Sequence, residues 1–175
     1  MKTLLTEEQL RAGIARLAEQ IRQHYAGRPL TLVGVMTGSI MLMADLVRLL
    51  DIPIRVELIQ SRNPGKGTDR PGPLVFDPEL LMTDIRGRHV LLVDDLFATG
   101  QTLWELVPQV DELGPASVRT VVLLRKQGRG QVATQPDFVG FDIPDMFVVG
   151  YGLDYNDRYR NLPYIAELEP QEMKG

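Results

Sequence analysis

Hydrophobic residues recur at helical spacing near the start of the chain and predict an amphipathic helix over residues 6–25. The apolar positions on one side of this helix are Leu10, Ile14, Leu17 and Ile21. Thr6 followed by Gln9 is a capping-box pattern, which places the helix start. Gly27 and Pro29 end the pattern, because neither residue continues a helix well.

Short segments downstream predict buried strands at 30–36, 55–60, 89–93 and 118–124, with a fifth, shorter strand at 147–151. Helical patterns cover 40–50 and a segment from about Gln101 to the stop at Gly114–Pro115, with a kink expected at Pro108. Strands that alternate with helices predict a single α/β domain over residues 1–175, with a mainly parallel sheet flanked by helices.

Residues 61–87 differ in kind from these segments. The first half, 61–73, holds three prolines, three glycines and several charges. A long stretch without regular structure in a compact domain is typically a functional lid or a disordered loop. Because an acidic strand end follows it, we favour a mobile lid that closes over a site. A flexible loop without function stays the alternative.

Composition narrows the class of protein. The chain has 175 residues, 44% of them hydrophobic, and no cysteine, which excludes disulfides and thiolate chemistry. It lacks an apolar run of the roughly 20 residues needed to span a bilayer, so we expect a cytoplasmic protein without a membrane partner. A net charge of −4 argues against nonspecific nucleic-acid binding. An anionic small molecule remains a possible ligand, held by backbone N–H groups and a cation.

The most informative segment is 90–103, VLLVDDLFATGQTL. It predicts a buried strand with Asp94 and Asp95 at its carboxyl end, where open α/β sheets bind ligands. Backbone N–H groups of 98–102, with the hydroxyls of Thr99 and Thr102, suit a phosphate at a helix N-terminus. Two adjacent carboxylates suit ribose hydroxyls or a hard cation. The alternative is an acidic pair that caps a helix and faces solvent.

This segment resembles the signature of the type I phosphoribosyltransferases, which bind phosphoribosyl pyrophosphate (PRPP). The resemblance implies the fold of that family with its mobile lid. It also implies that the catalytic acids Asp94 and Asp95 approach the ribose hydroxyls and a Mg²⁺ ion. The residues implied to hold PRPP at its 5′-phosphate are Ala98, Thr99, Gly100, Gln101 and Thr102.

The resemblance covers residues 30–168 and is greatest to the hypoxanthine-guanine phosphoribosyltransferases. Segments 33–39 (VGVMTGS) and 43–48 (MADLVR) are similar to the pyrophosphate-binding loop and helix of that family. This similarity implies that Thr37 and Gly38 contact pyrophosphate, with a cis peptide bond between Met36 and Thr37. Arg160, in the segment YRNLPY, is implied to reach the pyrophosphate as well.

The C-terminal third, 136–164, resembles the purine-binding end of the same family. The resemblance implies that Phe147 stacks on the base, that Val148 binds it through backbone groups, and that Asp154 lies at the base and coordinates magnesium. Lys126 is implied to donate to the 6-oxo group, which an ammonium suits because it has donors and no acceptor. Taken singly, Phe147 could be a core residue, Lys126 a solvated lysine and Asp154 a turn residue.

Three positions depart from the family pattern: Thr37 replaces a lysine, Ser61-Arg62 replaces Ser-Tyr, and Ala98 replaces the acid assigned to purine N7. Alanine at 98 is similar to adenine-specific relatives. The expected activity is transfer of phosphoribosyl from PRPP to hypoxanthine or guanine by a homodimer or homotetramer. Two alternatives stay open, a phosphoribosyltransferase for another base and a PRPP- or nucleotide-sensing regulator.

Overall fold

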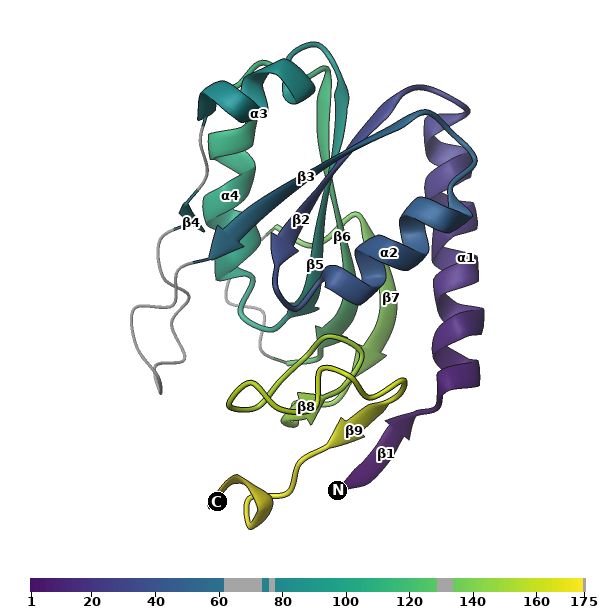
Figure 1. The fold of residues 1–175 in the computed structure, drawn as a ribbon, viewed down its shortest axis with the longest axis vertical. Helices are drawn as coiled ribbons and strands as arrows, with labels where there is room; N and C mark the ends of the chain where they lie inside the picture. Colours follow the sequence, from purple (N-terminus) through teal and green to yellow (C-terminus); the bar gives the residue numbers. More distant parts are fainter. Residues whose placement is uncertain (62–73, 76–77, 129–133, 175) are drawn as a thin grey trace.

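A six-stranded sheet forms the centre of the protein in a computed structural model that describes residues 1–61, 74–75, 78–128 and 134–174. The strand order is β4-β3-β2-β5-β6-β7 (Figure 1). Five strands are parallel, and β4 pairs antiparallel with β3 at one edge. The strands are β2 Leu30–Met36, β3 Ile54–Ser61, β4 Leu74–Val75, β5 His89–Phe97, β6 Ser117–Lys126 and β7 Phe138–Ile143.

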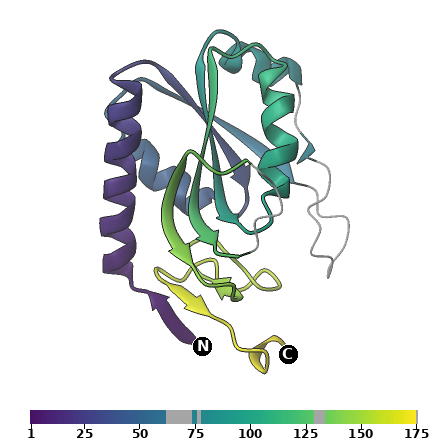
Figure 2. The same ribbon diagram turned by 180° about the vertical axis from the view of Figure 1, so that it is seen from behind.

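Helices cover both faces of this sheet, as the alternating pattern predicts (Figures 1 and 2). The helices are α1 Glu7–Tyr25, α2 Ile40–Leu49, α3 Pro78–Ile85 and α4 Gln101–Asp111. Residues of α1 and α2 pack into one core cluster, and residues of α3 and α4 pack into another on the opposite face. At the start of α1, Gln9 N–H donates to Thr6 Oγ1 at 3.2 Å and Thr6 N–H donates to Gln9 Oε1 at 2.8 Å. The predicted capping box is therefore confirmed.

The central strands are buried on both faces, as their sequence predicts. All residues of β2 except Met36 are buried, and β5 is buried from Val90 through Asp94. β5 is longer than the predicted 89–93, because its pairing with β6 continues through Asp94↔Val122 to Phe97↔Arg125. The acidic pair therefore lies within the strand instead of following it, and its backbone is fixed by the sheet.

The fifth parallel strand is β7, and the short strand predicted at 147–151 is present only in part and lies in a different sheet. Within that segment only Val148–Val149 (β8) is a strand, and it belongs to a small antiparallel sheet of order β1-β9-β8. The partners of β8 are β1 Lys2–Leu5 and β9 Ile165–Glu167. The chain leaves β8 at Gly150, whose φ of +100° turns the backbone sharply. A 3₁₀ turn, Glu172–Lys174, follows β9.

Part of segment 61–87 has regular structure, contrary to the sequence-based expectation. The helix α3 lies within it, because Leu81 and Ile85 recur one helical turn apart and are buried against the sheet, 3% and 0% exposed. Residues 62–73 and 76–77, which make up most of the predicted lid, lie outside the described residues. The lid therefore stays a prediction.

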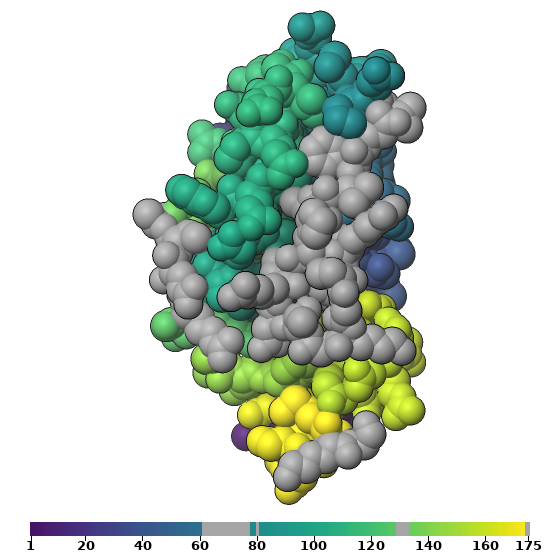
Figure 3. Space-filling view, turned by 90° about the vertical axis from the view of Figure 1, so that its left-hand side faces the viewer, coloured from purple at the N-terminus to yellow at the C-terminus, as the bar shows by residue number. Residues whose placement is uncertain are grey.

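Strand order places the topological switch point of the sheet at the carboxyl ends of β2 and β5. From these two neighbours the chain proceeds in opposite directions, to β3 on one side and to β6 and β7 on the other. Such a reversal is where open α/β sheets bind their ligands. The segment that carries β8 and β9 lies beyond these strand ends, at the opposite end of the molecule from α3 (Figures 1 and 3). None of the described helices has the length and hydrophobicity to cross a membrane.

Candidate active site

A cleft of about 490 Å³ opens at the carboxyl ends of β5 and β6. Eight of the residues singled out in the sequence line it together, although they come from three separate parts of the chain. They are Asp94, Ala98, Thr99, Gly100, Gln101, Thr102, Lys126 and Phe147. The structure thus brings the predicted phosphate-binding segment and two predicted base-binding residues together in one cleft.

The N-terminus of α4 faces this cleft. The chain turns from β5 into α4 at Gly100, whose φ of +83° lies in the left-handed region. Glycine adopts this conformation without the steric strain that a Cβ atom would cause. The N-cap residue Gly100 has no side chain that could accept from the first turn of α4, and Gln101 N–H donates to Thr99 Oγ1 at a long 3.3 Å. Uncapped N–H groups and the helix dipole together suit a phosphate at this place.

Asp94 and Asp95 form an acidic pair beside that N-terminus, in which Asp94 is buried and Asp95 is partly buried. Asp94 is 7% exposed, and its Oδ1 accepts a hydrogen bond from Asp95 N–H at 2.9 Å. Burial, and then the charge of Asp95, hold the pKa of Asp94 well above its usual range. Burial also raises the pKa of Asp95, against the lowering effect of its hydrogen bonds and of Arg160. A bound cation or sugar hydroxyls would relieve this repulsion.

The predicted pyrophosphate loop packs directly against Asp95. A Cβ atom built on Gly38 would lie 1.6 Å from Asp95 Oδ2, so this close approach requires glycine. The loop is held equally closely from the other side, because a Cβ on Gly152 would lie 2.2 Å from the Gly38 carbonyl oxygen. The peptide bond between Met36 and Thr37 is cis, as the family resemblance implies.

Arg160 and Asp154 continue this chain of contacts. Arg160 donates from Nη1 to the Gly152 carbonyl oxygen at 2.7 Å, and its Nη2 lies 2.9 Å from Asp154 Oδ1. Asp154 also accepts from Asp157 N–H at 2.8 Å. No group of three or more acids or histidines gathers into a metal-binding cluster among the described residues. The predicted set Asp94, Asp95 and Asp154 is therefore not a preformed cage.

Two of the predicted base-binding residues have side chains that line the cleft, and a third has its side chain in the core. Phe147 lines the cleft with 39% of its surface exposed and meets the Tyr155 ring edge-on at 5.6 Å. The Lys126 side chain is only 10% exposed, so it is not a solvated surface lysine. Val148 differs, because its side chain is buried in the core and only backbone groups of β8 could face a ligand.

Several residues that shape this region had no role predicted from the sequence. Leu96, Phe97, Leu103, Asp145 and Met146 also line the cleft. Asp145 was visible in the sequence, within the purine-end segment, but nothing in its pattern pointed to Lys126. The contact of Gly152 with Gly38 had no sequence signal, since it depends on how distant segments pack.

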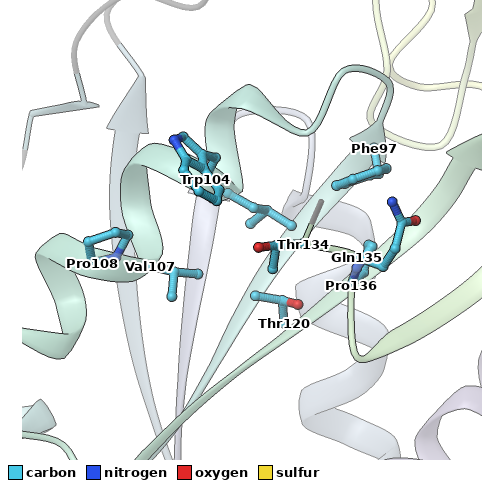
Figure 4. A pocket seen from close by; sticks show the side chains of 9 residues that line it. Phe97, Trp104, Val107, Pro108, Thr120, Thr134, Gln135 and Pro136 are labelled. Atoms are coloured by element: carbon cyan, nitrogen blue, oxygen red, sulfur yellow. The ribbon is translucent and has the colours of Figure 1, made fainter. Parts of the chain in front are cut away.

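A smaller apolar hollow of about 160 Å³ lies beside the cleft, between α4 and residues 134–136 (Figure 4). It shares Phe97 and Leu103 with the cleft, and Trp104 borders it with half of its surface exposed. None of the predicted site residues lines this hollow. The larger, more polar cleft therefore remains the candidate active site.

Comparisons with known proteins agree with this geometry. The family model for the phosphoribosyl transferase domain matches residues 1–156. The hypoxanthine-guanine phosphoribosyltransferase of Streptococcus pneumoniae is 39% identical over 170 residues, 97% of this chain and 94% of that protein. The bifunctional protein TilS/HprT of Listeria innocua is 38% identical over 170 residues, and the chain spans 26% of its length. The chain is also similar to a solved mutant hypoxanthine phosphoribosyltransferase from Trypanosoma cruzi, in a ternary substrates complex. That match has a TM-score of 0.87 at 38% identity, and it covers 98% of this chain and 97% of that one.

The buried acids lead to a stability prediction. Asp94→Asn removes a charge whose burial is unfavourable and keeps an oxygen that can accept from Asp95 N–H. Because the folded pKa of Asp94 is raised above 3.8, its charge costs stability only as pH rises above that value. We expect the free energy of unfolding of the ligand-free variant to exceed that of the unaltered protein at pH 7. The difference should vanish near pH 3.5.

The measurement is urea unfolding from pH 3.5 to 8, with Asp51→Asn, which removes an exposed carboxylate, as the matched control. An Asp94→Asn protein that follows the unaltered protein at every pH would show that the Asp94 carboxylate is not destabilising.

Proposed function

The chain belongs to the phosphoribosyltransferase family and within it to the hypoxanthine-guanine enzymes, and from this premise we propose how its residues carry out the reaction. The protein is a purine salvage enzyme that transfers the phosphoribosyl group of PRPP to N9 of hypoxanthine or guanine and releases pyrophosphate. The observation that carries the assignment of residues is the single cleft. It joins the N-terminus of α4, the buried carboxylate of Asp94, and the side chains of Lys126 and Phe147.

In this proposal the 5′-phosphate of PRPP binds at the N-terminus of α4, to N–H groups of 98–102 and the hydroxyls of Thr99 and Thr102. The ribose then lies beside Asp94 and Asp95, whose carboxylates accept hydrogen bonds from its hydroxyls and stabilise the positive charge that develops on the sugar. Gly38, Thr37 and Arg160 contact the pyrophosphate. Thr37 offers a hydroxyl where relatives have a lysine, so Arg160 is the cation assigned to this part of the site.

Magnesium fits the donor set without a preformed cage. Mg²⁺ usually takes one or two protein carboxylates and completes its shell with substrate phosphates and waters. Asp94 and Asp95 would supply such carboxylates, and PRPP and water would supply the remaining oxygens. When bound, the ion would neutralise the pyrophosphate leaving group. Asp154 is a further proposed ligand, and it would have to share its carboxylate with Arg160.

For the base, we assign stacking to Phe147, backbone hydrogen bonds to Val148 and the 6-oxo group to Lys126. The low exposure of the Lys126 side chain supports this role, because a partly desolvated ammonium discriminates more strongly between a carbonyl and an amino group. We also assign Asp154, which follows Phe147 and Val148 in the chain, to the border of the base. Residues 1–175 act in this proposal as one domain, and the part of 61–87 outside the described residues closes as a lid.

Ala98 leaves the proton of purine N7 without the acid of the relatives. Its side chain lines the cleft but offers only a methyl group. Water, or a lid carboxylate such as Asp69 or Asp77, could accept the proton; both residues lie outside the described part of the chain. This position is also why a different preferred base and a weakly catalytic PRPP sensor remain as alternatives.

We further propose that the enzyme works as a homodimer or homotetramer in the cytoplasm. Val56 and Leu58 support self-association, because both point to the same face of β3 and are 47% and 55% exposed. Neither nucleic acid nor a membrane is a proposed partner.

Base choice tests the assignment of Lys126. We expect hypoxanthine or guanine to be used well and adenine poorly, measured as pyrophosphate release with PRPP and magnesium. Lys126→Ala should lose roughly 2–3 kcal/mol of transition-state binding for the oxopurines, the scale for a charged hydrogen-bond partner. Reactions with excess chelator serve as blanks. Faster turnover of adenine than of both oxopurines would refute the assignment, and PRPP binding without any pyrophosphate release would favour the sensor.

Position 98 generates a separate prediction. A positioned general acid or base contributes about 10²- to 10⁴-fold. If nothing replaces the missing acid, the unaltered enzyme is slow by a factor within this range, and Ala98→Asp should recover part of it in kcat. Ala98→Asn, with similar size and no titratable group, is the control. If turnover is at the level of the relatives and Ala98→Asp leaves it unchanged, another group already handles the proton.

A further inference from the structure

An ion pair inside the cleft joins the proposed base-reading lysine to a residue without an assigned role. Lys126 Nζ lies 3.6 Å from Asp145 Oδ1, and both residues line the cleft. The side chain of Lys126 is 10% exposed, and that of Asp145 is 38% exposed. The lysine side chain is therefore mostly withdrawn from water, and the carboxylate beside it is the more exposed partner of the pair.

The backbone fixes the two residues beside each other. Lys126 is the last residue of β6 and pairs with Ile143, the last residue of β7. The next residue, Gln127, donates its N–H to the Ile143 carbonyl oxygen at 2.9 Å, which extends the ladder past the strand ends. Asp145 follows two residues after Ile143, so it meets Lys126 without a long or adjustable connection.

A partly buried ammonium needs a nearby negative charge, because withdrawal from water is costly for an unpaired ion. The separation of 3.6 Å is an ion-pair distance and exceeds that of an N–H···O hydrogen bond. Asp145 therefore attracts and orients the ammonium through charge, without fixing it as a short hydrogen bond would.

Asp145 also connects two parts of the proposed base site. Two residues after it comes Phe147, which lines the same cleft and is assigned to stack on the purine. The ion pair thus limits the distance between the Lys126 ammonium at the end of β6 and the Phe147 ring, which follows β7. Recognition of a base by both groups requires that their separation be fixed before the base arrives.

We infer that Asp145 is a positioning residue for Lys126 and thereby a determinant of selectivity for 6-oxopurines over 6-aminopurines. Asp145 keeps the ammonium at the cleft surface, where it can donate to a 6-oxo group and where it disfavours a 6-amino group. This inference rests on the proposed function of Lys126. It does not require Asp145 to touch the base.

The neighbouring pair Arg125–Asp142 offers a matched control. Arg125 Nε and Nη2 contact the Asp142 carboxylate at 2.6 and 3.0 Å, and this pair also bridges β6 and β7. Neither residue lines the cleft. Asp142→Asn therefore removes a carboxylate from the same strand junction without altering the base site.

The test is a double-mutant cycle with Asp145→Asn, Lys126→Met and the combined variant, measured as kcat and as separate KM values for hypoxanthine and PRPP. We expect Asp145→Asn to raise the KM for hypoxanthine about tenfold, the effect of a loss of about 1.4 kcal/mol, and to leave the KM for PRPP unchanged. Its preference for hypoxanthine over adenine should fall. In the Lys126→Met background the same substitution should have little effect, and Asp145→Glu should retain part of the affinity.

Several results would overturn the inference. One is an Asp145→Asn enzyme indistinguishable from Asp142→Asn, and another is a tenfold effect that persists without Lys126. A fall in kcat at unchanged KM for hypoxanthine would instead indicate proton transfer by Asp145. If Lys126→Met itself leaves the use of hypoxanthine unchanged, the proposed role of Lys126 is wrong and the inference fails with it. If only Lys126→Met matters, the role of Lys126 stands and that of Asp145 does not.

Discussion

The site depends on a contact in which there is no room for a side chain. Gly38 lies between Asp95 and Gly152, and a Cβ atom on either glycine would overlap an oxygen atom of the neighbouring segment. Three segments distant in sequence meet here, from the ends of β2, β5 and β8. Because Arg160 donates to the Gly152 carbonyl oxygen, this contact also places the cation proposed for pyrophosphate. The relative positions of Asp95, Gly38 and Arg160 thus follow from close packing of the backbone.

Electrostatics explains why such a site is fit for an anionic substrate that carries its own metal ion. The sheet holds Asp94 buried and Asp95 partly buried, and withdrawal from water raises the pKa of both groups. The N-terminus of α4, which has glycine at its N-cap, presents backbone N–H groups beside them. Each group is unfavourable alone, but a phosphate, ribose hydroxyls and Mg²⁺ would satisfy all of them together. The ligand-free protein therefore gives up stability at the place where PRPP is proposed to bind.

Much of this arrangement was predictable, and the exceptions have physical causes. The central strands and the capped α1 follow from local patterns, because burial on both faces and capping act over a few residues. β7 was missed because a partly exposed edge strand lacks a continuous apolar run. The helix α3 was hidden by the glycine- and proline-rich residues before it. The candidate residues were found through family resemblance, whereas the contacts Gly38–Gly152 and Lys126–Asp145 required the packed structure.

The central claim is that close packing of Gly152 on the loop of Gly38 builds the pyrophosphate end of the site. It is tested most directly by kcat/KM for PRPP in Gly152→Ala, compared with Gly27→Ala. Both glycines have positive φ, but a Cβ on Gly27 meets nothing within 4 Å. Both variants should stay folded by circular dichroism. We expect Gly152→Ala to lose about 10²-fold, the scale for misplaced substrate groups, and Gly27→Ala to stay within about twofold of the unaltered enzyme. A folded Gly152→Ala enzyme as active as Gly27→Ala would contradict the account.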